Sequence, residues 1–189
     1  MKGWILFNET ATAKPEWYEI SRLVDVAKEN NIEIDVFKPE QFDLIVTRDD
    51  RKSVTVDGKV LPLPDFVLPR MGAGTTYFAL AVIRHLERLG VHTFNSSQSI
   101  DTVKDKLFTH QILAEHNLPV PKTMLIKYPA DVDYVEKHLG FPVVVKTISG
   151  SQGSGVFLAE TRSKFEDVME LINAYKKNAN IILQEFIHT

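Results

Sequence analysis

Residues 143–159 read VVVKTISGSQGSGVFLA, and this stretch decides the fold of the second half of the chain. Two apolar runs, 143–145 and 156–158, flank a segment that contains Gly150, Gly153 and Gly155. Apolar runs of this length predict buried strands, so the glycine-rich segment joins two strands. P-loops and dinucleotide fingerprints need a helix directly after the glycines, and neither is predicted here. A glycine-rich hairpin can still close over a triphosphate, because its backbone N–H groups can approach anionic oxygens closely; an ordinary flexible hairpin is the alternative.

Lys146 ends the first of these strands. A buried ammonium is costly without an anionic partner, so a lysine at this position is predicted to face phosphate. The alternative is a lysine whose long side chain reaches solvent from the strand end. Lys106 lies on a predicted amphipathic helix, where the ordinary role of a lysine is a solvated surface position.

Residues 181–187, IILQEFI, form an apolar strand that a Gln-Glu pair interrupts. Strand alternation places Gln184 and Glu185 on opposite faces, so at least one polar side chain points inward. Backbone groups at such a strand end can pair with the edge of a purine, with Phe186 and Ile187 packed near it. An edge strand that leaves the core is the alternative.

Strands alternate with helices in the first part of the chain. This alternation predicts a parallel-dominated sheet covered on both faces. Asp57-Gly58 is in addition a two-residue hairpin signal. The predicted strands are 3–7, 32–37, 42–47, 53–61, 65–70 and 91–94, and the predicted helices run from Pro15 to Asn30 and from Thr76 to Leu89.

The pattern changes at the polar stretch 95–99, which ends the sheet and can cap a following helix. A second α/β unit follows, and Ser163 with Glu166 is expected to form a capping box for its last helix. Beyond the two strands already described, the predictions are helices at 101–116, 130–139 and 164–176 and strands at 123–126 and 181–186.

The composition is that of an ordinary globular protein, and it excludes several classes of site and partner. The chain has 189 residues and no cysteine, which excludes disulfides and thiolate zinc sites. Its formal charge of −3 provides no basic field for nucleic acid. The absence of a signal peptide and of a long apolar run predicts a cytoplasmic protein that does not enter a membrane. The six histidines form no HxH or HExxH pair, so solvated or hydrogen-bonded histidines are expected instead of a metal site.

Several spaced motifs, taken together, resemble the ATP-grasp ligases, and the nearest branch is the RimK-type glutamate ligases. The match runs in order from about Asp65 to the last residue, whereas the earlier part agrees only in its general α/β character. Agreement of several motifs is much more specific than any single one. The motifs are Leu68-Pro69-Arg70-Met71-Gly72, Asn95, Asp105-Lys106-Leu107, Pro119, Val143-Val144-Val145-Lys146, the loop 150–155 with Leu158-Ala159-Glu160-Thr161, and Gln184-Glu185-Phe186-Ile187.

The resemblance implies a specific domain order. Residues 1–97 would form a pre-ATP-grasp, Rossmann-like parallel-sheet domain, and residues 98–119 a connecting helix. Residues 120–189 would form the first ATP-grasp α+β subdomain, truncated after the hinge strand.

The resemblance also implies an ATP-dependent carboxylate-amine ligase that forms an amide through an acyl phosphate. Lys106 and Lys146 would contact the phosphates, Lys146 in addition the adenine. The loop 150–155 would close over the β- and γ-phosphates, and Glu185 with Phe186 would form the adenine hinge. Arg70 is a candidate acceptor-side contact, with a structural turn as the alternative. The implied ATP-binding residues are Lys106, Lys146, Gly150, Ser151, Gln152, Gly153, Ser154, Gly155, Gln184, Glu185, Phe186 and Ile187.

Magnesium ligands and catalytic residues are expected beyond Thr189, because the family places them downstream of the hinge. The sequence therefore predicts an ATP-binding fragment that does not turn over. After Lys146 the only acids are Glu160, Glu166, Asp167, Glu170 and Glu185.

The resemblance implies three partners: ATP, an amino acid such as glutamate, and a carboxylate acceptor on a protein, peptide or coenzyme tail. The oligomeric state is not readable, although many members of the family self-associate. Two alternatives stay open. One is a stand-alone nucleotide-binding module without catalysis, and the other is a different ATP-grasp branch, such as D-alanine or glutathione-type ligation.

Overall fold

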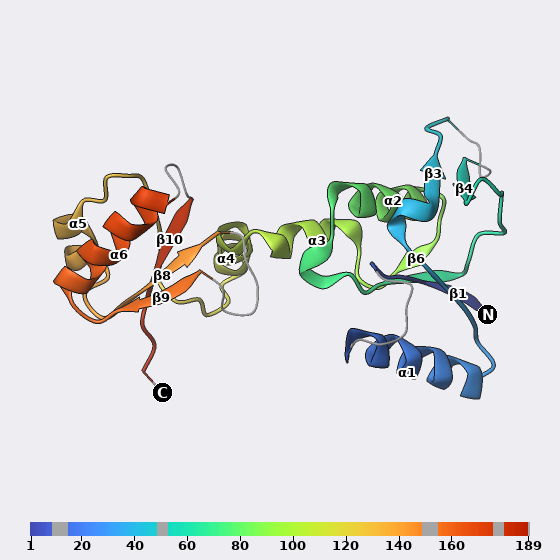
Figure 1. Cartoon of the computed structure of the whole chain (residues 1–189), viewed down its shortest axis with the longest axis horizontal. Coiled ribbons are helices and arrows are strands. Elements are labelled where there is room, and N and C mark those ends of the chain that lie inside the picture. The colour runs from blue at the N-terminus through green and yellow to red at the C-terminus, as the bar shows by residue number, and fades with distance from the viewer. Residues whose placement is uncertain (9–14, 49–52, 149–154, 176–179, 189) are drawn as a thin grey trace. The chain divides into compact units, whose positions relative to one another are not determined.

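The computed structural model describes residues 1–8, 15–48, 53–148, 155–175 and 180–188 (Figure 1). The chain divides into two compact units, Met1–Asp101 and Thr102–Thr189, and each is described by itself.

The first unit is built on a parallel sheet, as the sequence predicts, and the order of its strands is β2-β1-β5-β6. Alternation along β1 supplies both faces of this sheet with apolar side chains. Ile5 packs with Ile20 of α1 on one face, whereas Trp4 and Leu6 pack with Ile83 of α2 on the other. The elements are β1 (Lys2–Leu6), α1 (Pro15–Glu29), β2 (Glu33–Phe37), β5 (Phe66–Pro69), α2 (Tyr77–Arg88) and β6 (His92–Thr93).

The predicted hairpin at Asp57-Gly58 is only partly correct. Both residues have positive φ, 50° and 72°, and the backbones of Val56 and Lys59 exchange two hydrogen bonds across the turn. However, β4 (Val54–Val56) pairs with β3 (Phe42–Leu44) and not with a strand after the turn. The residues after Lys59 include Pro62 and Pro64, which have no N–H to donate to a ladder. Two short 3-10 turns, η1 (Pro39–Gln41) and η2 (Gly72–Gly74), complete the unit.

The single connecting helix predicted for residues 98–119 is wrong, because two helices occupy this stretch. They are α3 (Ser97–Lys104) and α4 (Lys106–Glu115). Asp105 separates them with an extended backbone, and its carboxylate accepts a hydrogen bond from Phe108 N at 3.0 Å. The aspartate thus caps a new helix, which the apolar periodicity alone did not indicate.

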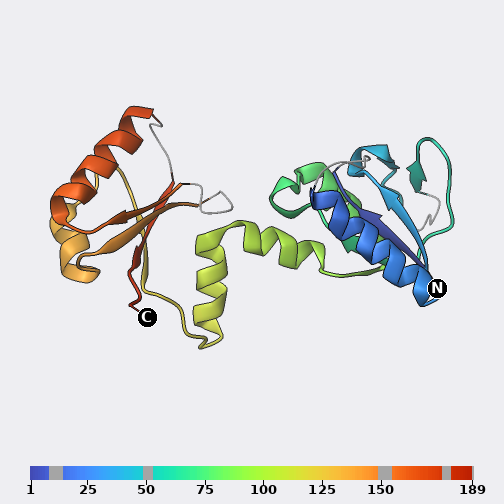
Figure 2. The same ribbon diagram turned by 60° about the horizontal axis from the view of Figure 1, so that its bottom comes forward.

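The second unit contains an antiparallel sheet with strand order β7-β10-β8-β9. Helices α5 and α6 cover one face of it (Figure 2), where Val145 and Leu183 pack against Phe165 and Met169. The glycine-rich segment joins two antiparallel strands, β8 and β9, as predicted. The elements are β7 (Thr123–Ile126), α5 (Val132–His138), β8 (Val143–Thr147), β9 (Val156–Ala159), α6 (Arg162–Tyr175) and β10 (Ile181–Glu185).

The capping box predicted at Ser163 and Glu166 is wrong, because α6 begins one residue before Ser163. Thr161 is the capping residue, and its hydroxyl accepts a hydrogen bond from Lys164 N at 3.3 Å. Glu166 instead forms an ion pair with Arg162 at 3.3 Å. Within the described ranges, none of the helices combines the length and apolarity needed to cross a bilayer.

Candidate functional site

The candidate site lies on the face of the second sheet that α5 and α6 leave uncovered. Val145 and Leu183 are cross-strand partners on the helix-covered face. Alternation therefore places their neighbours Lys146 and Gln184 together on the opposite face. Helix α4 reaches this face, because its His110 Nε2 lies 2.7 Å from Gln184 Nε2. The sheet and α4 thus bring together residues that are far apart in the sequence.

Lys146 lies half-buried on this face, and its ammonium donates a hydrogen bond to Gln184 Oε1. Burial lowers the pKa of Lys146, and the positive charge of Lys106 lowers it further. A lysine that loses hydration and also faces a second cation favours an anionic ligand, which would relieve both costs.

Lys106 is the first residue of α4, and Asp105 caps this helix. Its Nζ donates a hydrogen bond to the carbonyl of Ile148 at 3.1 Å. Ile148 follows β8 and lies two residues before Gly150, the first glycine of the glycine-rich segment. Both predicted phosphate-binding lysines therefore lie at the β8 end from which this segment starts.

Five residues of the predicted phosphate loop, Gly150, Ser151, Gln152, Gly153 and Ser154, lie outside the described residues. Gly155 is described, and it closes the hairpin by accepting a hydrogen bond from Thr147 N at 3.1 Å. Its φ is +73°, and a Cβ at this position would lie 2.7 Å from Thr147 Oγ1. Glycine is therefore required here both by its backbone conformation and by the space available.

The predicted hinge residues lie in three different environments. Gln184 is the inward-pointing residue of the Gln-Glu pair, with 4% of its surface exposed. The Glu185 carboxylate instead accepts a hydrogen bond from Lys122 N at 2.7 Å and so anchors the strand end. Phe186 and Ile187 follow the end of β10 and are 37% and 58% exposed.

Two residues of this site, His110 and Thr123, were not predicted from the sequence. Both contact the Gln184 side chain, at 2.7 Å and 3.0 Å. The four-residue spacing from Lys106 to His110 places both on one side of a helix and was a usable signal. Thr123 gave no comparable signal, because its pairing with Gln184 depends on the strand order of the sheet.

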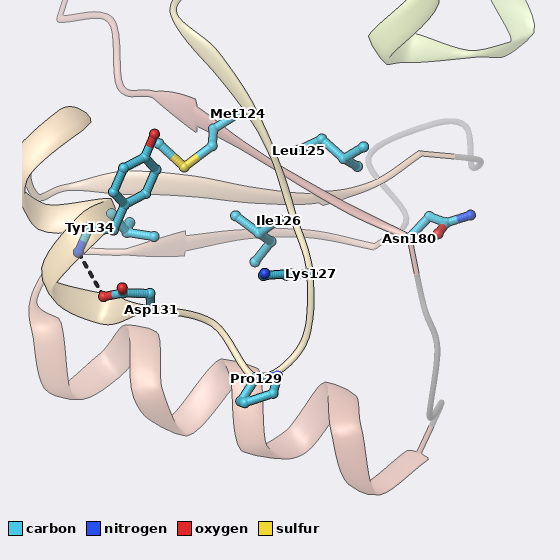
Figure 3. A pocket seen from close by; sticks show the side chains of 9 residues that line it. Met124, Leu125, Ile126, Lys127, Pro129, Asp131, Tyr134 and Asn180 are labelled. Carbon is cyan, nitrogen blue, oxygen red and sulfur yellow. Dashed lines mark hydrogen bonds between the residues drawn. The ribbon is translucent and has the colours of Figure 1, made fainter.

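A cavity of the second unit lies elsewhere, beside the edge strand β7 and the start of α5 (Figure 3). Its volume is about 490 Å³ and its walls are largely apolar. Asp131 faces the backbone of Tyr134 and accepts its N–H at 3.0 Å, so this carboxylate caps α5. Among the described residues of the predicted ATP set, none lines this cavity. The lysine pair is the better anion site, because phosphate needs cations and N–H donors.

Arg70 and the acidic residues were the remaining charged candidates for a ligand or metal site. Arg70 forms an ion pair with Glu19 of α1, which is a structural contact inside the first unit. Within the described ranges, no group of three or more histidines and acids is positioned to hold a metal ion. We assign none of the described residues to magnesium.

Two family models cover almost the whole chain. Residues 9–100 match the RimK PreATP-grasp domain, and residues 103–189 match the RimK-like ATP-grasp domain. A relative named "Probable alpha-L-glutamate ligase 1", from Shewanella amazonensis, is 37% identical over 174 residues. A "Probable alpha-L-glutamate ligase" from a Marinomonas strain is 36% identical over the same length. Each alignment includes 92% of this chain but only 57% of the relative.

Solved structures share the fold at low sequence identity. A RimK domain ATP-grasp protein from Sphaerobacter thermophilus superposes with a TM-score of 0.71 at 17% identity, over 100% of this chain and 65% of that one. The ATP-grasp ligase PsnB, solved with a precursor peptide and AMPPNP, gives 0.70 at 17% identity, over 98% and 65%. D-alanine–D-alanine ligase from Bacillus anthracis gives 0.65 at 18% identity, over 99% and 57%. These likenesses support the pre-ATP-grasp and ATP-grasp fold of the two units.

Proposed function

Because the chain belongs to the RimK-like ATP-grasp family, we propose that it forms the ATP-binding part of an ATP-dependent carboxylate-amine ligase. The observation that carries this proposal is the convergence of Lys106 and Lys146 at the start of the glycine-rich segment. Phosphoryl transfer depends mainly on positioning and on neutralising charge, and two lysines beside a donor-rich loop supply part of both.

In the proposed reaction, ATP phosphorylates a carboxylate, and the oxygen of the carboxylate displaces ADP from the γ-phosphorus. An amine then attacks the acyl phosphate and displaces phosphate, which leaves an amide. Lys106 and Lys146 would hold the phosphates of ATP, the segment 150–155 would cover them, and the end of β10 would receive the adenine. The names of the relatives favour glutamate, or a similar amino acid, as the amine, with a carboxylate on a protein, peptide or coenzyme as the acceptor.

We further propose that the 189-residue polypeptide binds ATP without consuming it. The chain spans 57% of the relatives named glutamate ligase, and the resemblance places the magnesium ligands and catalytic residues of the family downstream of the hinge. The polypeptide supplied with magnesium, glutamate and a glutamate-ending peptide is expected to release no ADP above background. Sustained ADP release would contradict this part of the proposal.

The ATP-binding part is tested by titrating Lys146→Ala with ATP in a calorimeter. Removing a charge-assisted contact to phosphate is expected to weaken affinity by at least about tenfold. Lys137→Ala is the matched control, because Lys137 lies exposed in the last turn of α5 in the same unit. Unchanged affinity in Lys146→Ala would overturn the assignment of this lysine.

A further inference from the structure

The Gln184 side chain is buried, and each end of its amide has a hydrogen-bond partner. Its Oε1 accepts a hydrogen bond from the Lys146 ammonium. Its Nε2 donates to Thr123 Oγ1 at 3.0 Å and to His110 Nε2 at 2.7 Å. A primary amide has two N–H donors, so these two acceptors use both of them.

Each of the two acceptors is held in its role by a backbone carbonyl, which can only accept. The Thr123 hydroxyl donates its single proton to the carbonyl of Pro121 at 2.8 Å, so its oxygen is left to accept from Gln184. His110 Nδ1 lies 2.5 Å from the carbonyl of Lys106 and must therefore be the protonated nitrogen. In the neutral ring the other nitrogen, Nε2, is then an acceptor.

We propose that His110 is a positioning residue for ATP binding: with Thr123, it fixes the orientation of the Gln184 amide so that Oε1 faces Lys146. If the amide rotated by half a turn, its NH₂ group would face an ammonium and its oxygen would face two acceptors. All three hydrogen bonds would then be lost. This inference rests on the proposed role of Lys146 in holding the nucleotide.

A neutral amide at position 184, beside the Lys146 ammonium, is consistent with an anionic ligand. A carboxylate in place of Gln184 would neutralise Lys146 by forming an ion pair, whereas the neutral amide oxygen holds the ammonium and leaves its charge uncompensated. The remaining charge is then available to a phosphate group. The network therefore fixes the place of Lys146 without reducing the attraction that the lysine exerts on ATP.

The experiment compares two substitutions of the same histidine. His110→Gln can place an oxygen acceptor near the position of Nε2, whereas His110→Leu removes the acceptor and keeps a side chain of similar bulk. Calorimetric titration of the 189-residue protein with ATP is expected to show about a tenfold loss of affinity for His110→Leu and less than about a threefold loss for His110→Gln. A purely structural role would weaken binding only in proportion to the loss of thermal stability, so the melting temperature of each variant is recorded as well.

A second measurement tests the network without ATP. A long-range ¹H–¹⁵N spectrum of the unmodified protein at neutral pH is expected to show His110 with a protonated Nδ1 and an unprotonated Nε2. The opposite tautomer, or equal ATP affinity in His110→Leu and the unmodified protein, would overturn the inference. If the unmodified protein bound no ATP, the proposed function would fail, and the tautomer would still decide whether the network exists.

Discussion

At the scale of single residues, the charged Lys146 side chain lowers the folding stability of the protein when no ligand is bound. Burial and the neighbouring Lys106 lower the pKa of Lys146, so the folded chain binds this proton less tightly than the unfolded chain does. A folded pKa below the unfolded value means that the charged form opposes folding at neutral pH, and that this cost disappears as the pH rises above the ordinary lysine range. An anionic ligand removes the same cost by supplying the missing opposite charge. ATP binding and Lys146 protonation are therefore linked.

This linkage predicts that ATP affinity falls at alkaline pH. As the pH rises through the lowered pKa, Lys146 loses its charge before an ordinary lysine would, so affinity is expected to begin falling below the ordinary lysine pKa of about 10.4. Lys146→Arg is the control, because a guanidinium keeps its proton at these pH values. The measurement is calorimetric titration at several pH values. Parallel profiles for the two proteins would show that some other group causes the decline.

At the scale of elements, the β8–β9 hairpin contains a glycine, Gly155, at which any other residue would be strained. Gly155 and Gly140 have nearly the same positive φ, 73° and 71°. They differ in their surroundings, because a Cβ on Gly155 would meet Thr147 Oγ1 at 2.7 Å, whereas a Cβ on Gly140 would meet nothing within 4 Å. Comparing substitutions of Gly140 and Gly155 therefore separates the energetic cost of backbone strain from the cost of steric overlap.

Gly140→Ala is expected to lower the free energy of unfolding by about 1–2 kcal/mol, the cost of a left-handed backbone in a residue with a Cβ. Gly155→Ala should lower it by about 1–3 kcal/mol more, because Thr147 must move to admit the methyl group. Urea denaturation of both variants measures the difference. Equal losses would show that the Thr147 side chain moves aside without cost.

The elements themselves could largely be predicted from the sequence. Strand β8 and the β8–β9 hairpin were predicted because apolar β-branched residues and glycines are local signals. The break at Asp105 was missed, because the apolar pattern continues across it and only the capping aspartate indicates a new helix. The start of α6 was missed for a related reason: Thr161 and Ser163 can both cap, and the sequence alone did not distinguish them.

The site was less predictable than the elements. The strand-end position of Lys146 predicted that it faces phosphate, and alternation predicted that Gln184 or Glu185 points inward, whereas the role of Lys106 came from a resemblance. The roles of these residues in binding ATP remain predictions. His110 and Thr123 could not be placed, because their contacts with Gln184 require the strand order and the packing of α4 on the sheet. Such contacts between distant segments exist only after the chain has folded, so a local pattern does not contain them.

At the scale of the whole molecule, each unit has its own hydrophobic core. In the first unit Leu86 is fully buried in a cluster with residues of β1 and β5, and in the second unit Leu183 is fully buried in a cluster with residues of β8 and α6. Among the described residues, these clusters share no member. The apolar burial that stabilises one unit is therefore separate from the burial that stabilises the other.

Truncation of these two leucines is expected to have different consequences. Leu86→Ala and Leu183→Ala should each destabilise their own unit by about 2–5 kcal/mol, because each leaves a cavity in a closed core. Amide hydrogen exchange read by mass spectrometry should then rise in β1, β5 and α2 for the first variant, and in β8, β10 and α6 for the second. ATP affinity should fall only for Leu183→Ala, because Leu183 directly precedes Gln184 on β10, and the loosened strand no longer holds the amide that faces Lys146. A loss of affinity in Leu86→Ala, or faster exchange in β8 and β10 of that variant, would show that ATP binding depends on the first core as well.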